Sequence, residues 1–162
     1  MTRYHPSLVA LHWLMALLIA VLLSSGGLAP TRMHVVGGAI AAGLLALRIV
    51  VRLAMTRHLP TSVDRKWRKR AAKCVHVGLY VLVGGAVVSG IGVAIEADLL
   101  AAYIDNRAVH GFSEGALYAL HVALTDLLLI AILGHLAAAF WHQFIRKDRI
   151  LSKIWFGKPE SE

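Results

Sequence analysis

Residues 118–144 read YALHVALTDLLLIAILGHLAAAFWHQF, a stretch apolar enough to cross a membrane that nevertheless carries three histidines. His121, His135 and His142 are 14 and 7 residues apart. At about 100° per residue, this spacing places all three within roughly 60° of one face of a helix. A histidine stripe of this kind predicts a shared neighbour for the three imidazole rings.

The composition places the whole chain in a membrane. Of its 162 residues, 58% are hydrophobic and 16% are charged, whereas about a quarter of a typical soluble domain is charged. Four apolar runs each reach the roughly 20 residues that a helix needs to cross the hydrocarbon core. The runs are residues 8–29, 33–54, 74–95 and 116–144. The sequence therefore predicts an all-α fold, an integral membrane four-helix bundle that forms a single domain over residues 1–162.

Most of the net charge of +8 lies in two segments, which follow the second and the fourth apolar run. Their basic residues are Arg57, Arg65, Lys66, Arg68, Lys69, Arg70, Lys73, Arg146, Lys147, Arg149, Lys153 and Lys158. The other two connecting segments hold only Arg32 and Arg107. Under the positive-inside rule, this asymmetry predicts N- and C-termini on the cytoplasmic side. The basic residues lie beside span ends, so nucleic-acid binding is the weaker interpretation.

Two connecting segments have further features. Residues 61–73 read TSVDRKWRKRAAK and predict a short interfacial helix with Trp67 at headgroup level. Residues 96–114 carry four acidic side chains against Arg107 alone. The outer face of the protein is therefore predicted to be acidic.

The histidines of different runs lie at matching depths. His12 is about 8 Å from the cytoplasmic end of its run, and His135 is about 14 Å from the same surface. On the other side, His34 opens the second run and His121 lies about 8 Å into the fourth. The depths predict two pairs about 21 Å apart along the fourth run, an inner pair of His12 with His135 and an outer pair of His34 with His121. A single histidine at membrane depth is equally well explained by a hydrogen bond to a neighbouring helix.

Two imidazoles for each iron suit haem b. A haem held on both faces has no open coordination position and favours electron transfer, and bundle cores bind such cofactors between facing helices. Cys74 is the sole cysteine, so covalent haem attachment through two cysteines is excluded. Arg48 has two interpretations, a contact with the propionates of the inner haem or snorkelling to the cytoplasmic headgroups.

The sequence resembles the bacterial cytochrome b561 family, which is related to the cytochrome b subunits of nickel-iron hydrogenase and formate dehydrogenase. The segments that carry the resemblance are RYHPSLVALHWLMALLI, MHVVGGAIAAGLLALRIVVRL, VHVGLYVL and LHVALTDLLLIAILGHLAAAFWHQFIRKDRIL. The resemblance implies that His12 and His135 bind the iron of an inner haem b, and that His34 and His121 bind the iron of an outer one. It also implies a multi-pass protein of the bacterial cytoplasmic (inner) membrane.

The resemblance further implies a quinone-linked oxidoreductase. Its members are similar to carriers that pass electrons from an external small-molecule or protein donor, superoxide for some, to ubiquinone or another quinone. Two features here depart from the superoxide pattern. The outer segment is acidic, whereas a basic surface attracts an anion. The third run also lacks the proline that the family often has near its outer end and reads VGGAVVSGIGV over residues 83–93.

Quinone reduction consumes protons, which histidine exchanges near neutral pH. We expect His76 and His142, together with Lys73, to border a quinone site beside the inner haem, because all three lie near the cytoplasmic ends of their runs. The alternative is that both rings anchor span ends at the headgroups. Asp126 lies off the histidine stripe, and we expect it to accept a hydrogen bond from a hydroxyl such as that of Ser25 or Ser89 or to relay a proton.

Two other functions remain open. One is a membrane anchor, the cytochrome b subunit that links a larger extracytoplasmic oxidoreductase to quinone. The other is a non-redox bundle, either structural or built to bind transition metals through its histidines. The sequence favours the self-contained electron carrier because its loops are short.

Overall fold

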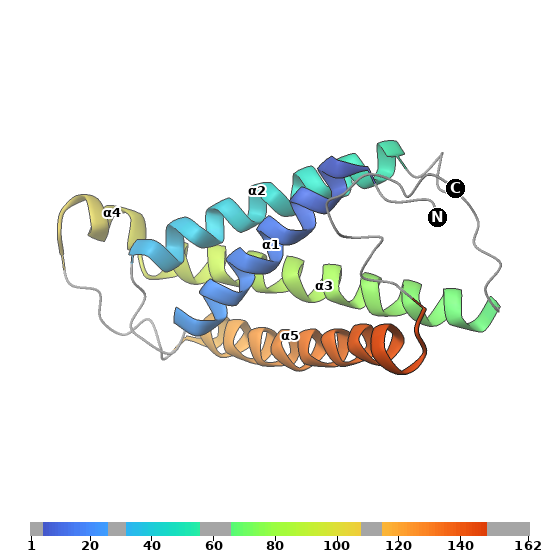
Figure 1. Cartoon of the computed structure of the whole chain (residues 1–162). Helices are drawn as coiled ribbons and strands as arrows, with labels where there is room; N and C mark the ends of the chain where they lie inside the picture. Colours follow the sequence, from blue (N-terminus) through green and yellow to red (C-terminus); the bar gives the residue numbers. More distant parts are fainter. Residues whose placement is uncertain (1–4, 26–31, 56–65, 108–114, 149–162) are drawn as a thin grey trace.

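The computed structural model describes residues 5–25, 32–55, 66–107 and 115–148, and every regular element in these ranges is helical. In chain order, the elements are α1 (Pro6–Ser25), α2 (Arg32–Met55), α3 (Lys66–Glu96), α4 (Leu99–Ile104), α5 (Ala116–Phe140) and the π-helical turn η3 (Trp141–Ile145). Figure 1 shows the long helices α1, α2, α3 and α5 with the short α4 at one end; α2 packs against α1 and α3, and α3 packs against α5.

The four predicted spans are confirmed. Four helices in the described ranges are long and apolar enough to cross a membrane, at Pro6–Ser25, Arg32–Ala54, Arg70–Glu96 and Ala116–Ile145. The fold is therefore the all-α membrane bundle that the sequence predicts. Its orientation in the membrane stays a prediction.

Two features differ from the prediction. The basic segment does not form a separate interfacial helix, because α3 begins at Lys66 and runs without a break for 31 residues to Glu96. Residues 66–73 contain neither glycine nor proline, and their Lys, Arg and Ala residues favour continuation of the helix. Residues 61–65 of the predicted interfacial helix lie outside the described residues, as do residues 26–29 of the first predicted span.

The short helix α4 was not expected. It follows a turn in which Asp98 has a left-handed backbone with φ of 48°, a conformation that the short side chains of Asp and Asn tolerate. Leu99 is 2% exposed and anchors the helix to the bundle. Arg32 at the start of α2 donates to the Tyr103 carbonyl at 2.6 Å and to the Asn106 side chain, which ties α4 to α2.

The core combines one side chain from each span. Met15, Leu45, Val83 and Leu128 form a buried cluster, and the main helix contacts join α1 with α2, α2 with α3 and α3 with α5. In α5 only Leu128 is buried, and large apolar residues on every span are exposed. This distribution suits a bundle whose outer surface meets lipid, where apolar exposure has no cost.

The packing of α1 on α2 depends on a glycine. A Cβ added at Gly37 would lie 2.9 Å from Leu22 Cδ2, whereas a Cβ at Gly43 on the same helix would meet nothing within 4 Å. Overpacking of a close helix contact costs about 1–3 kcal/mol.

Because the contact atom is the end of the flexible Leu22 side chain, we expect Gly37→Val to lower the free energy of unfolding by about 1 kcal/mol relative to Gly43→Val, the lower end of this range. Both variants place the same β-branched residue in α2, so the comparison cancels the change in helix propensity. The check is thermal unfolding of both variants in the same detergent. Equal midpoints for the two would contradict the close approach at Gly37.

Candidate functional site

The structure brings His34 and His121 together at one end of the bundle. His34 lies in the first turn of α2, and His121 lies in the second turn of α5. Their ring centroids are 6.3 Å apart and their planes are nearly perpendicular, at 87°. These are the residues that the depth argument assigns to the outer pair.

Both rings of this outer pair are oriented through Nδ1. His121 Nδ1 lies 2.9 Å from the Ala86 carbonyl and 3.1 Å from Ser89 Oγ, both on α3. Because a carbonyl can only accept, His121 Nδ1 carries the proton and its Nε2 keeps a free electron pair. Ser25 Oγ lies 3.2 Å from His34 Nδ1. Histidines that bind metals are commonly held in this way by a hydrogen bond at the other ring nitrogen.

A glycine makes room for the His121 ring. A Cβ added at Gly90 on α3 would lie 3.0 Å from Cε1 and 3.3 Å from Nδ1 of His121. A larger residue would push the ring away from Ala86 and Ser89. The close approach of α3 therefore fixes where the imidazole of α5 points.

At the other end of the bundle, three histidines gather with an arginine. The rings of His76 on α3 and His135 on α5 are 5.5 Å apart at 79°. His12 on α1 is near enough to interact electrostatically with both. The ring contact of His135 is thus with His76, although the sequence pairs it with His12. His12 is held by Arg48 instead, whose Nη2 lies 3.2 Å from Nδ1 of His12.

Arg48 is half-buried and points into the bundle. Its Nε donates to the hydroxyl of Tyr80 at 3.0 Å, and its Nη1 is buried with no hydrogen-bond partner in the described structure. These contacts favour the inward interpretation of Arg48 over snorkelling. An unpaired guanidinium nitrogen at membrane depth is costly, so the arrangement suits an anionic group placed beside it.

Tyr80 is a site residue that sequence reasoning missed. It bonds Arg48, and the guanidinium of Arg52 lies 5.7 Å from the centre of its ring. The sequence does contain a signal for this residue. Tyr80 lies four residues after His76 and therefore on the same face of α3.

The three residues expected at a quinone site are not joined by contacts. His76 Nδ1 lies 2.6 Å from the Ala72 carbonyl, and His142 Nδ1 lies 2.8 Å from Asp148 Oδ2. Lys73 is exposed. Within the described ranges, no hydrogen bond or ring contact links His142 with His76 or Lys73.

Asp148 is a second residue that the sequence did not reveal. Besides His142, it accepts from Arg146 Nε at 3.1 Å. The hydrogen bond from His142, together with the charge of Arg146, holds the pKa of Asp148 below its usual range. The carboxylate is therefore ionised at neutral pH.

Asp126 does not have the predicted hydroxyl partner. It is exposed on α5, and the hydroxyls of Ser25 and Ser89 bond backbone carbonyls and the two outer histidines. The expected hydrogen bond is therefore wrong for these described residues. The side chain faces away from the core.

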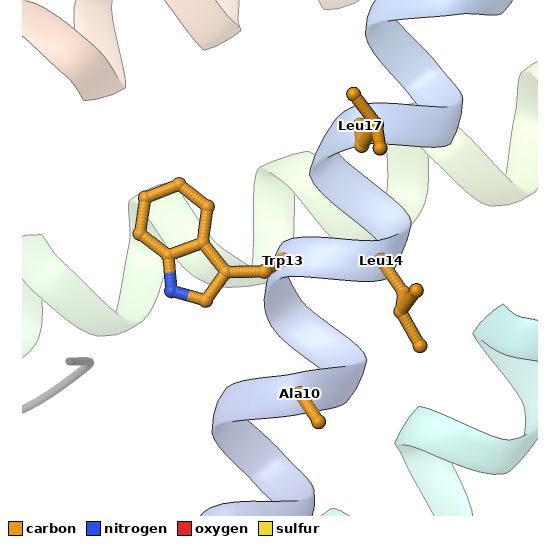
Figure 2. A pocket seen from close by; sticks show the side chains of 4 residues that line it. All are labelled: Ala10, Trp13, Leu14 and Leu17. Atoms are coloured by element: carbon orange, nitrogen blue, oxygen red, sulfur yellow. The ribbon is translucent and has the colours of Figure 1, made fainter. Parts of the chain in front are cut away.

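A pocket on the bundle surface adjoins the inner cluster, because Trp13 of its lining lies 5.7 Å from His12, measured between ring centroids. Ala10, Trp13, Leu14 and Leu17 of α1 line it, as Figure 2 shows, and no histidine contributes to the lining. Three of these side chains are exposed large apolar groups, so the pocket suits a lipid chain.

The histidine clusters do not form a conventional metal centre. In the part of the chain that the structure describes, no group of three or more His, Cys, Asp or Glu residues could hold a metal ion. The alternative of a transition-metal site made of side chains alone therefore has no support from these residues.

A membrane helical bundle with facing imidazoles between its helices is the architecture of a membrane cytochrome b. The family model of the prokaryotic cytochrome b561 matches residues 3–157, and the chain belongs to this family. It is a multi-pass membrane protein with an electron-transfer role, and the family implies haem b as its cofactor. No curated protein and no solved structure matches the chain.

The residues of the outer pair fit haem b. The rings of His34 and His121 come from different helices and lie 6.3 Å apart, so the two imidazoles would hold a haem between them, and the haem would supply one-electron redox chemistry there. The buried, unpartnered Nη1 of Arg48 also fits a haem, whose propionates pair with guanidinium groups.

We expect Gly90→Ala to weaken haem binding, because the added Cβ would displace the His121 ring by a few tenths of an ångström. The matched control is Gly84→Ala on the same helix, where a Cβ would meet only Leu45 Cδ2 at 3.9 Å. The measurement is haem content per chain after purification, with the redox potential of the retained haem. Equal haem content and potential in both variants would contradict the role of Gly90.

Proposed function

We propose that this chain carries electrons across the membrane between a donor outside and the quinone pool, through two haems b. In this proposal His34 and His121 bind the outer haem, and His12 and His135 bind the inner one. Haem b supplies one-electron redox chemistry at its iron. The protein itself orients the imidazoles, excludes water from them and provides the proton chemistry at the cytoplasmic end.

The observation that carries the proposal is the outer pair of rings. His34 and His121 come from different helices and face each other, and each has its Nδ1 hydrogen-bonded. His135 follows His121 on the same helix at a distance of about 21 Å along the axis. One helix therefore supplies a ligand at each end, which supports two stacked cofactors.

The inner site requires rearrangement, because the ring of His135 lies against His76 and His12 is bonded to Arg48. Arg48 now donates to Nδ1 of His12, which places the His12 proton on Nε2. If His12 held a haem through Nε2, its proton would lie on Nδ1 and Arg48 would need another acceptor. Arg48 already has an unpartnered Nη1, so a propionate carboxylate is a suitable acceptor for its guanidinium.

In the proposal, His76, His142 and Lys73 border the quinone site. His76 supports this placement because its ring lies against His135, a proposed ligand of the inner haem. His142 supports it because its ring is only partly exposed and is bonded to an ionised carboxylate. Quinone reduction takes up two protons with two electrons, and an imidazole is a side chain suited to proton transfer.

The proposed orientation has both termini in the cytoplasm of a bacterium, with the chain in its inner membrane. The support is the concentration of Lys and Arg after the second and fourth spans. His12, Arg48, His76 and His135 then lie at the cytoplasmic end, and α4 lies outside.

The described outer surface does not favour superoxide as the donor. Arg107 is engaged by Asp98 and Asp105 at 3.2 Å each, and Arg32 is bonded to the Tyr103 carbonyl and to Asn106. Both cations are thus already engaged, so neither provides an open attraction for an anion. A neutral molecule or a protein suits this surface better.

The experiment that tests the quinone step is replacement of His142 with Phe, which keeps an aromatic ring and removes the exchangeable proton. We expect the reduced protein to be reoxidised by added quinone about 10²-fold more slowly, the lower range for loss of a general acid or base. The haem absorption spectrum should not change. Stopped-flow absorbance gives both quantities.

The control is His5→Phe, since His5 is exposed and bonded to Ser7 near the start of α1. The His5→Phe protein should be reoxidised by quinone at the rate of the unchanged protein and show the same haem spectrum. Reoxidation of His142→Phe at the unchanged rate would contradict the quinone assignment. Loss of the haem spectrum in this variant would mean that His142 is an iron ligand.

A further inference from the structure

The chain folds back on itself where the fourth span ends. The π-helical turn Trp141–Ile145 is followed by Lys147, whose backbone is left-handed with φ of 56°. Residues with a side chain rarely adopt this conformation. The backbone N–H of Asp148 donates to the carbonyl of His142 at 2.9 Å. This turn brings a carboxylate back beside a ring that lies six residues earlier.

The side chains of the same two residues form a second contact. His142 Nδ1 donates to Asp148 Oδ2 at 2.8 Å, since an ionised carboxylate can only accept. The contact fixes the imidazole tautomer and leaves Nε2 as the nitrogen that exchanges protons. Asp148 is bound to His142 through both backbone and side chain, so the ring and the carboxylate are held as a unit.

The surroundings explain why a carboxylate is needed here. Among the described residues, Arg146 and Lys147 lie on the same turn, Arg70, Lys73 and His76 lie on α3, and His12, Arg48 and His135 lie in the inner cluster at this end. Apart from the histidines, these groups are cations. Their positive charge opposes protonation of a nearby imidazole, and the negative charge of Asp148 offsets this effect.

We propose that Asp148 is the positioning residue of a proton relay in which His142 exchanges protons between cytoplasmic water and the quinone. This inference rests on the quinone function proposed above. It assigns to Asp148 the task of holding the ring with Nε2 directed away from the carboxylate and of stabilising its protonated form. The arrangement matches the general pattern in which a carboxylate orients a catalytic histidine.

The proton and electron balance is simple. Reduction of a quinone adds two electrons, which arrive from the outside donor by way of the haems, and converts two carbonyl oxygens into hydroxyls. For each proton delivered, the Nε2–H bond of His142 breaks and an O–H bond forms. The neutral ring keeps the proton on Nδ1, where it stays hydrogen-bonded to Asp148. The ring then takes a new proton from water at Nε2. Quinol oxidation is the same sequence in reverse.

The test uses the purified haem-loaded protein in lipid nanodiscs, with ubiquinone-1 as the probe, and compares Asp148→Asn with Asp148→Glu. The rate of haem reoxidation is measured from pH 6 to pH 9.5. We expect Asp148→Asn to move the alkaline fall of the rate to lower pH by about one unit, a tenfold loss at a fixed alkaline pH. Asp148→Glu should restore the profile, because it returns the carboxylate.

The matched control is Asp105→Asn, which removes a carboxylate from an exposed ion pair with Arg107 at the other end of the bundle. It should leave the pH profile unchanged. A uniform rate loss at all pH values in Asp148→Asn, or a profile identical to that of the unchanged protein, would overturn the relay. An unchanged protein that ubiquinone-1 fails to reoxidise at any pH would overturn the quinone function, and with it the relay.

A second readout does not depend on activity. In protein labelled with ¹⁵N-histidine, the His142 signal, assigned by its absence from His142→Phe, should report a protonated Nδ1 at pH 8. In Asp148→Asn we expect a mixture of the two neutral tautomers. The same single tautomer in both proteins would overturn the positioning role of Asp148.

Discussion

The two imidazole rings of the outer pair each have Nδ1 in a hydrogen bond to a neighbouring polar group. At the outer pair, the Ala86 carbonyl and Ser89 hold Nδ1 of His121, while Ser25 meets Nδ1 of His34. A polar ring is costly at membrane depth unless it is paired in this way. The hydrogen bonds satisfy Nδ1 of each half-buried ring, and the two ring centroids lie 6.3 Å apart.

This constraint organises the helices around it. Gly90 lets α3 approach close enough for its backbone carbonyl to meet a ring on α5. At the other end of the bundle, Arg48 donates hydrogen bonds to both His12 and Tyr80 and so holds the His12 ring in place. The described polar contacts thus form two clusters between the helices, one at each end of the bundle.

The sequence predicted the parts of this structure that depend on period and depth. Four spans follow from hydropathy, and the approach of His34 to His121 follows from equal depth in the membrane. Contacts that depend on local backbone geometry were not predictable in this way. The position of Asp148 beside His142 requires a π-turn and a left-handed residue, and neither leaves a periodic signal. The helix α4 likewise depends on a left-handed Asp98.

The central claim is that facing imidazoles bind two haems b in each chain. The most direct measurement is the ratio of haem to protein in the purified chain, determined by the pyridine haemochrome method, for the unchanged protein and for His34→Ala. The account predicts two haems per chain in the first and one in the second. A single haem in the unchanged protein, or two in the variant, would contradict it.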